Sequence, residues 1–175
     1  MGGTLWAEST GVPGEGTTFH LELPVQTAPE CAARPTPAPA LLAGKRVLVV
    51  DDHENNRKIL AIQTARWQME PVTAPDARTA LQLVESEGPF DLAILDVQMP
   101  EMDGITLAQK LRQMPATREL PIIILTPLGM RETLPEELES AAYLHKPVKP
   151  APLQQVILQA LAHEKITLRP AETAR

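Results

Sequence analysis

The sequence predicts an α/β protein built on an open, doubly wound parallel sheet of five strands with helices on both faces. Three short apolar runs carry this prediction, because strands buried on both faces of a parallel sheet show no polar alternation. The runs lie in residues 46–52 (RVLVVDD), 91–96 (DLAILD) and 121–126 (PIIILT). Segments with helical spacing of apolar residues separate them, and this alternation with right-handed crossovers produces a doubly wound sheet.

The chain begins with a segment outside this pattern. Residues 1–25 (MGGTLWAESTGVPGEGTTFHLELPV) predict two strands joined by a glycine turn, and a lone two-stranded hairpin is marginal in water. Residues 26–44 contain prolines among alanines, a composition that favours extended, polyproline-like conformers. We therefore expect a hairpin followed by a semi-rigid Pro/Ala-rich linker.

Two weaker strands and a set of amphipathic helices complete the pattern. The strand at 69–74 (MEPVTA) contains Pro71, which suits an edge position because proline donates no ladder hydrogen bond. The strand at 141–146 (AAYLHK) is short. Apolar residues share one helix face in three segments: Ala77, Ala80, Leu81 and Val84; Leu107, Ala108 and Leu111; and Leu153, Val156, Ile157, Ala160 and Leu161.

Composition limits the classes of function. Of 175 residues, 43% are apolar and 3% aromatic, which is enough for one aliphatic core. A net charge of −6 makes nucleic acid a poor partner, and no apolar run approaches the roughly 18–20 residues of a membrane span. The single cysteine, Cys31, matches no catalytic or metal-binding pattern, so we expect a reducing, cytoplasmic location and no membrane contact by this chain.

Polar side chains gather where the predicted strands end. Asp51 and Asp52 end the first strand, and Asp96, Thr126 and Lys146 end the third, fourth and fifth. The crevice beyond the carboxyl ends of the strands is the usual ligand site of such sheets. Three carboxylates there would repel one another unless a cation compensates, and hard oxygen ligands suit Mg²⁺. A nucleophilic Asp96, beside a metal, an ammonium and a hydroxyl, predicts phosphoryl transfer to aspartate.

Four motifs in order resemble the bacterial response-regulator receiver domain: VLVVDDHENNRKIL, DLAILDVQMPEMDG, PIIILT and YLHKP. The similarity covers residues 45–163, and the spacings between the motifs agree with those of the family. It implies a flavodoxin-like sheet with strand order 2-1-3-4-5 and Asp96 as the phosphoacceptor. It further implies that Asp52 binds Mg²⁺ directly, Asp51 mostly through water, and Gln98 through its backbone carbonyl.

The same resemblance assigns roles on the last two strands. It implies that Thr126 and Lys146 contact the phosphoryl group and that the Lys146–Pro147 peptide is cis, which X–Pro bonds permit. Thr126 and Tyr143 match the family's switch pair, although a partly buried structural tyrosine is the alternative for Tyr143. Two further histidines, His53 and His145, flank the site, and we expect both to face solvent.

The chain departs from the family in two places. Pro127 follows Thr126 where the family usually has a small residue, and proline removes a backbone N–H. We expect slower phosphotransfer or altered dephosphorylation as a result. The capping pattern of Thr133 and Glu136 predicts a fourth helix of only about two turns, over residues 134–141.

The opening hairpin resembles the last strands of a histidine-kinase ATP-binding domain, because MGGTLW, a G-x-G turn and TFHLELP occur in order. Kinase end, linker and receiver in this order imply a hybrid sensor kinase, whose remainder could be membrane-anchored. The nucleotide-binding boxes and the phosphodonor histidine helix are missing from the sequence. We therefore expect that this chain neither binds ATP nor phosphorylates itself from ATP, and that Gly14 and Gly16 are turn residues.

Three functions are compatible with these residues. The leading one is a phosphorelay receiver that takes a phosphoryl group from a phosphohistidine onto Asp96 and passes it to a histidine phosphotransfer protein. Such a receiver catalyses only its own phosphorylation and dephosphorylation. The alternatives are an interaction module that is never phosphorylated and a Mg²⁺-dependent phosphohydrolase. The hydrolase needs a D-x-D pair, whereas Asp51 and Asp52 are adjacent. The tail at 164–175 is polar and expected to fray.

Overall fold

A computed structural model describes residues 2–12, 14–24, 40–127 and 141–162. The chain divides into two compact units, Met1–Thr36 and Pro37–Arg175, each of which is described here by itself. Three predictions lie wholly or largely outside the described residues: the linker at 26–44, the short fourth helix at 134–141 and the polar tail at 164–175.

The first unit is the predicted hairpin. Strands β1 (Thr4–Glu8) and β2 (Thr18–Glu22) pair antiparallel, with Leu5 opposite Leu21 and Ala7 opposite Phe19. Because side chains alternate across a strand, these four residues share one face. On the other face the rings of Trp6 and His20 stack with centroids 4.9 Å apart. The hairpin is therefore apolar on one face and polar on the other.

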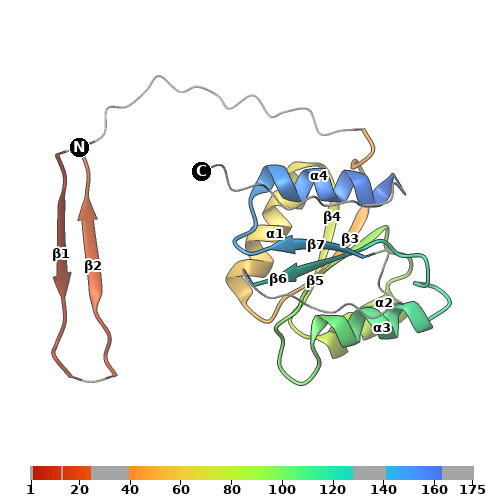
Figure 1. The fold of residues 1–175 in the computed structure, drawn as a ribbon, viewed down its shortest axis with the longest axis horizontal. Helices are drawn as coiled ribbons and strands as arrows, with labels where there is room; N and C mark the ends of the chain where they lie inside the picture. The colour runs from red at the N-terminus through yellow and green to blue at the C-terminus, as the bar shows by residue number, and fades with distance from the viewer. Residues whose placement is uncertain (1, 13, 25–39, 128–140, 163–175) are drawn as a thin grey trace, which may run out of the picture. The chain divides into compact units, whose positions relative to one another are not determined.

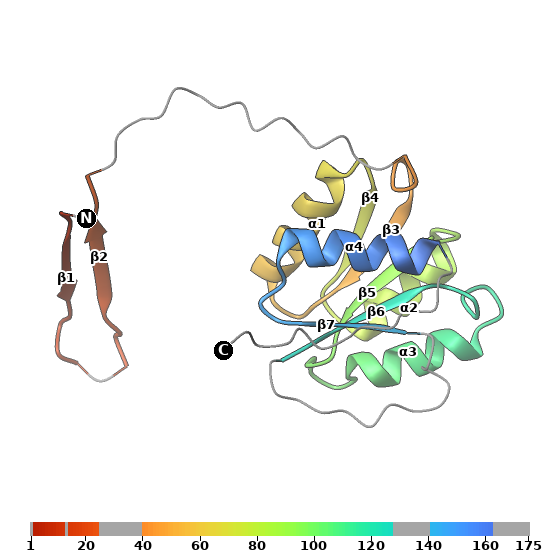
Figure 2. The same ribbon diagram turned by 45° about the horizontal axis from the view of Figure 1, so that its top comes forward.

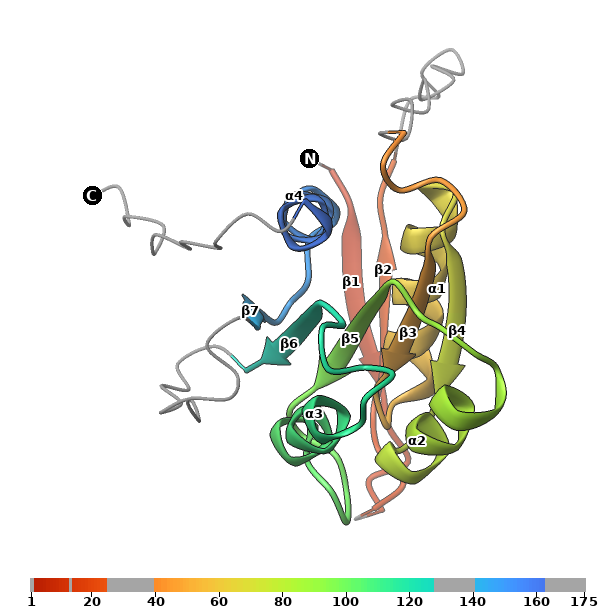
Figure 3. The same cartoon turned by 90° about the vertical axis from the view of Figure 1, so that its right-hand side faces the viewer.

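The second unit is a five-stranded parallel sheet (Figure 3). Its strands are β3 (Arg46–Val50), β4 (Glu70–Ala74), β5 (Leu92–Asp96), β6 (Ile122–Thr126) and β7 (Ala142–His145). They lie in the order β4-β3-β5-β6-β7, which confirms the expected 2-1-3-4-5 arrangement. The strand that contains Pro71 lies at the edge, as predicted, because an edge position does not need the missing N–H.

Helices cover both faces of this sheet (Figures 1 and 2). On one face α1 (Glu54–Arg66) and α4 (Pro150–Leu161) bury Leu60, Leu153 and Ile157 against the strands. On the other, α2 (Ala77–Ser86) and α3 (Gly104–Gln113) bury Ala80 and Leu107. The two core layers explain why the central strands are apolar throughout.

Side-chain caps fix where two of these helices begin. Asp76 accepts a hydrogen bond from the Thr79 amide at the start of α2, and Asp103 accepts one from the Thr106 amide at the start of α3. Each cap satisfies an amide that has no partner within the helix. Asp103 therefore sets where the loop after Asp96 ends.

The described end of the predicted linker packs against the sheet unit. Residues 40–44 form a turn in which Leu42 is fully buried in the α1–α4 layer of the core. The Gly44 amide donates to the Gln68 carbonyl at 2.8 Å, and Gly44 has φ = +71°, a conformation that favours glycine. The domain thus begins a few residues before its first strand. Within the described residues, no helix is both long and apolar enough to cross a bilayer.

Candidate functional site

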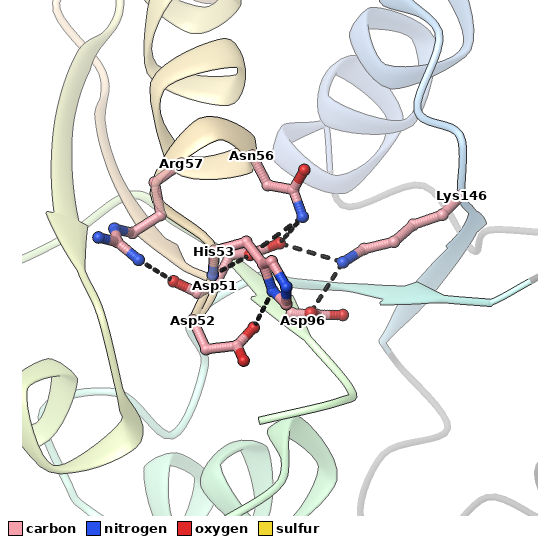
Figure 4. Close-up of polar contacts among 7 residues, drawn as sticks. All are labelled: Asp51, Asp52, His53, Asn56, Arg57, Asp96 and Lys146. Carbon is pink, nitrogen blue, oxygen red and sulfur yellow. Dashed lines mark hydrogen bonds and ion pairs between the residues drawn. The ribbon is translucent and has the colours of Figure 1, made fainter. Parts of the chain in front are cut away.

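The polar residues predicted at the strand ends meet at one edge of the sheet. The chain leaves β3 for β4 on one side and returns to β5 on the other, so loops diverge beyond the carboxyl ends of β3 and β5 and leave a crevice. Asp51 follows β3, Asp96 ends β5 and Lys146 follows β7 (Figure 4). The three side chains point toward one another, as the sequence predicts.

Lys146 joins two of the carboxylates. Its Nζ lies 2.7 Å from Oδ2 of Asp96 and 3.1 Å from Oδ2 of Asp51. Burial lowers the pKa of Lys146, but hydrogen bonds and charge from Asp96 and Asp51 outweigh burial and raise it. The ammonium therefore stays charged at the mouth of the crevice.

Asp96 has one oxygen that remains available. The residue is 2% exposed, and although Oδ2 pairs with Lys146, the buried Oδ1 accepts no hydrogen bond from the described part of the chain. Burial raises the pKa of Asp96, and the nearby Asp51 charge adds to this, while Lys146 and the Gln98 amide oppose it. A buried carboxylate oxygen without a partner is costly, so this oxygen is suited to a cation or a reacting atom.

Asp51 is held by the first turn of α1. Its carboxylate is fully buried and accepts hydrogen bonds from the His53 amide at 2.8 Å and from Asn56 Nδ2 at 3.2 Å. The Arg57 guanidinium donates to the Asp51 carbonyl at 2.6 Å. These contacts fix the orientation of the carboxylate toward the crevice.

Asp52 completes an acidic cluster. Its side chain is 26% exposed, and His53 Nδ1 lies 2.7 Å from its Oδ1. Ligand atoms of Asp51, Asp52 and His53 lie within 4.8 Å of one another. Together with the open oxygen of Asp96, oxygens of this kind are compatible with a divalent metal ion.

The loop after β5 packs closely under the site. The Gly104 amide donates to the Val97 carbonyl at 3.1 Å, and a Cβ added at Gly104 would overlap the Asp96 carbonyl oxygen. Only glycine fits this approach. Gln98 is exposed at the edge of the crevice, and its amide favours the charged form of the Asp96 carboxyl.

Thr126 has a partner that the sequence did not indicate. The residue is 3% exposed, and its Oγ1 lies 2.9 Å from Nδ1 of His145. Tyr143 is partly buried and precedes His145 on β7 by two residues, so both face the same side of the sheet. The Lys146–Pro147 peptide is cis, as the family resemblance implies.

A cavity extends from the site between α1 and residues 146–148, which precede α4. It measures about 560 Å³; Asp51 and Lys146 lie on its polar side, and Ile59, Pro127 and Val148 are among its apolar residues. Pro127 therefore borders the same space as Asp51 and Lys146.

The sequence identified the residues at strand ends but not the partners that hold them. The expectation that His53 and His145 face solvent is confirmed by their exposure, yet each also contacts a site residue. The sequence analysis did not identify Asn56 and Arg57 as partners of Asp51. Their position indicated it, because the first turn of a helix that begins at Glu54 brings both residues back over the end of β3.

Comparisons with known proteins agree with this geometry. The family model "Response regulator receiver domain" matches residues 47–158. The response regulator PleD of Caulobacter vibrioides is 41% identical over 105 residues, which are 59% of this chain and 23% of PleD. Sensor protein TorS of Escherichia coli is 30% identical over 167 residues, 93% of this chain and 17% of TorS. Sensor histidine kinase GacS of Pseudomonas protegens is 34% identical, covering 83% of this chain and 18% of GacS.

Solved structures show the same fold. The chemotaxis protein CheY4 of Vibrio cholerae superposes with a TM-score of 0.60 and 31% identity, covering 68% of this chain and all (100%) of CheY4. The receiver domain of a histidine kinase from Syntrophus aciditrophicus gives a TM-score of 0.60 and 27% identity, covering 75% of this chain and 100% of that domain. The chain thus spans less than a quarter of the curated relatives above, whose shares are 23%, 17% and 18%, and through residues 47–158 it belongs to the response regulator receiver domain family.

Proposed function

We propose that the receiver accepts a phosphoryl group from a phosphohistidine onto Asp96 as one step of a two-component phosphorelay. The observation that carries the proposal is the state of the Asp96 carboxylate. One oxygen is paired with Lys146, and the other is buried without a partner among the described residues. This arrangement supports a nucleophile that is oriented by a cation and open on one side.

In the transfer, one bond forms and one bond breaks at phosphorus. An Asp96 oxygen attacks phosphorus, the phosphorus–nitrogen bond breaks, and its electron pair returns to the donor imidazole. Lys146 and the Thr126 hydroxyl would contact the phosphoryl oxygens. Asp51, Asp52, Asp96 and the Gln98 carbonyl would hold Mg²⁺, which when bound would neutralise charge on the transferred group.

We also propose that the receiver is the C-terminal part of a cytoplasmic segment of a hybrid histidine kinase. The alignments with TorS and GacS cover 93% and 83% of this chain, more than the receiver match at 47–158. This coverage supports the interpretation of residues 1–25 as the end of a kinase ATP-binding domain. A histidine phosphotransfer protein is then the acceptor that fits the leading hypothesis.

Incubation with acetyl phosphate and Mg²⁺, followed by intact-protein mass spectrometry, tests the proposal. We expect the wild-type chain to gain one phosphoryl group and Asp96→Asn to gain none. Asp103→Asn is the matched control, because Asp103 lies on the loop after Asp96 but only caps α3; it should gain the group as the wild type does. No gain at all would favour an interaction module, and turnover of phosphate esters would favour a hydrolase.

A further inference from the structure

We propose that His145 is a positioning residue that holds the Thr126 hydroxyl in the resting arrangement of the site, and that this hydroxyl must leave His145 before it contacts a phosphoryl group on Asp96. The inference rests on the phosphoacceptor role proposed above. The phosphoacceptor role of Asp96 does not itself involve His145.

The backbone fixes the two residues side by side. Thr126 and His145 are register partners at the ends of the parallel strands β6 and β7, and the Lys146 amide donates to the Thr126 carbonyl at 2.8 Å. Register partners in a parallel pair direct their side chains to the same face of the sheet. The 2.9 Å separation between Oγ1 and Nδ1 is therefore a consequence of strand register.

The hydroxyl can serve only one acceptor at a time. A threonine hydroxyl has a single proton to donate, and Thr126 is 3% exposed whereas His145 is exposed. The 2.9 Å contact can form with either tautomer of the ring. The proposal assigns the ring proton to Nε2, so that the Thr126 hydroxyl donates to Nδ1 in the resting arrangement. A phosphoryl oxygen on Asp96 would need the same Thr126 proton, so His145 and the phosphoryl group compete for it.

Competition of this kind sets an equilibrium between two arrangements. If the ring is replaced by a side chain that accepts no hydrogen bond, the resting arrangement loses one stabilising contact and the phosphoryl-bound arrangement loses none. A net hydrogen bond corresponds to a change of about threefold to tenfold in an equilibrium constant. Ligands that prefer the phosphoryl-bound arrangement then bind more tightly by that factor.

Binding of trifluoroberyllate with Mg²⁺, a phosphoryl mimic on a carboxylate, measures this equilibrium without a covalent step. Tyr143 is the chain's one tyrosine, so incorporated fluorotyrosine gives a single ¹⁹F signal two residues from His145. We expect His145→Leu to bind the mimic about threefold to tenfold more tightly than the wild type. His145→Asn, whose amide occupies the position of Cγ and Nδ1, should remain within about twofold of the wild type.

The Thr126→Val background separates positioning from a structural effect. In that background His145→Leu should change the affinity no further, because the hydroxyl for which His145 competes is gone. Unchanged or weaker binding by His145→Leu, or tightening that persists with Thr126→Val, would overturn the inference. If the wild type itself does not bind the mimic, the proposed phosphoacceptor role fails and the inference fails with it. If the wild type binds the mimic and His145→Leu has no effect, the inference about His145 fails while the proposed phosphoacceptor role stands.

Discussion

The hairpin and the receiver sheet are built from strands of similar length, yet their burial is opposite. All residues of β1 and four of five in β2 are exposed, with Leu5 at 67% and Phe19 at 71%. In the receiver sheet, Leu48 and Ile94 are fully buried. The central receiver strands are apolar on both faces, and helices cover both faces of their sheet. The hairpin strands alternate with polar residues and have only one apolar face.

Among the described residues, the cluster of carboxylates and an ammonium lies in the receiver unit. The receiver places the Asp96 carboxylate, the Lys146 ammonium and an acidic cluster at one edge of a sheet that has a core layer on each face. The hairpin presents one apolar face, formed by Leu5, Ala7, Phe19 and Leu21, and the described residues of its unit, 2–12 and 14–24, supply no second layer. We infer that the hairpin belongs to the core of another domain, whereas the receiver sheet has its own core on both faces.

The largest contrast is expected in stability. Ile94→Ala should destabilise the receiver by about 2–5 kcal/mol, because it leaves a cavity between two packed layers. Leu21→Ala in the hairpin should change the same unfolding transition by less than about 0.5 kcal/mol, because Leu21 is 65% exposed. Urea unfolding measures both, and equal effects of the two substitutions would contradict the comparison.

A smaller loss is expected at the site itself. Lys146→Met leaves the Asp51 and Asp96 carboxylates without their shared cation and should destabilise the receiver by about 2 kcal/mol. This is below the usual cost of breaking a buried pair because the Lys146 side chain is 28% exposed. Lys58→Met, which breaks an exposed pair with Glu54, is the control and should have almost no effect. A stability loss as small as that of the control would show that the pair is not needed for folding.

The pH dependence of the free energy of unfolding should show that the charged Asp96 carboxylate destabilises the folded receiver. Burial raises its pKa above the ordinary 3.8, so its contribution to stability is present in acid and is lost as the pH rises through the raised pKa. Asp96→Asn carries no such charge. Its urea midpoint should therefore exceed that of the wild type at neutral pH, and the two midpoints should lie closer together at a pH near 3.8. A wild-type advantage at neutral pH would contradict this sign.

A kinetic effect is expected at Pro127. Proline supplies no amide that could donate to the phosphoryl group, and Pro127 borders the cavity beside Lys146. We expect Pro127→Ala to phosphorylate up to about tenfold faster with acetyl phosphate, or to change its dephosphorylation rate by a similar factor. Stopped reactions analysed by intact mass give both rates. Identical rates in the two proteins would remove the idea that this proline limits transfer.

The smallest effect is expected from the hairpin. Deletion of residues 1–24 should leave both the urea midpoint of the receiver and its phosphorylation rate unchanged within error, because the two units are compact separately. A clear loss of stability or of phosphorylation rate would show that the receiver depends on the hairpin, contrary to this expectation.

Much of this architecture was predictable because strand ends carry the chemistry. The apolar runs at 46–50 and 92–95 predicted buried strands, and the order of Asp51, Asp96 and Lys146 at their ends predicted which side chains meet. Such predictions depend only on the periodicity of a strand and on the geometry of a parallel sheet.

The partners of these residues were less predictable because they depend on rotamers and register. Asn56 reaches Asp51 only through the exact phase of α1, and His145 reaches Thr126 only because β6 and β7 pair in one register. A sequence places His145 beside Lys146 but does not state which residue across the sheet it contacts. Leu42 was assigned to the linker by composition, yet it is buried in the core, because a short turn brings it back onto the sheet.

Reductive trapping locates the residue that accepts the phosphoryl group. Borohydride converts an aspartyl phosphate to homoserine, so treatment of the chain after exposure to acetyl phosphate and Mg²⁺ marks the phosphorylated residue, and peptide mass spectrometry locates it. We expect homoserine at position 96 and at no other aspartate. Homoserine at Asp51 or Asp52, or none anywhere in a folded protein, would contradict the assignment of Asp96 as the phosphoacceptor.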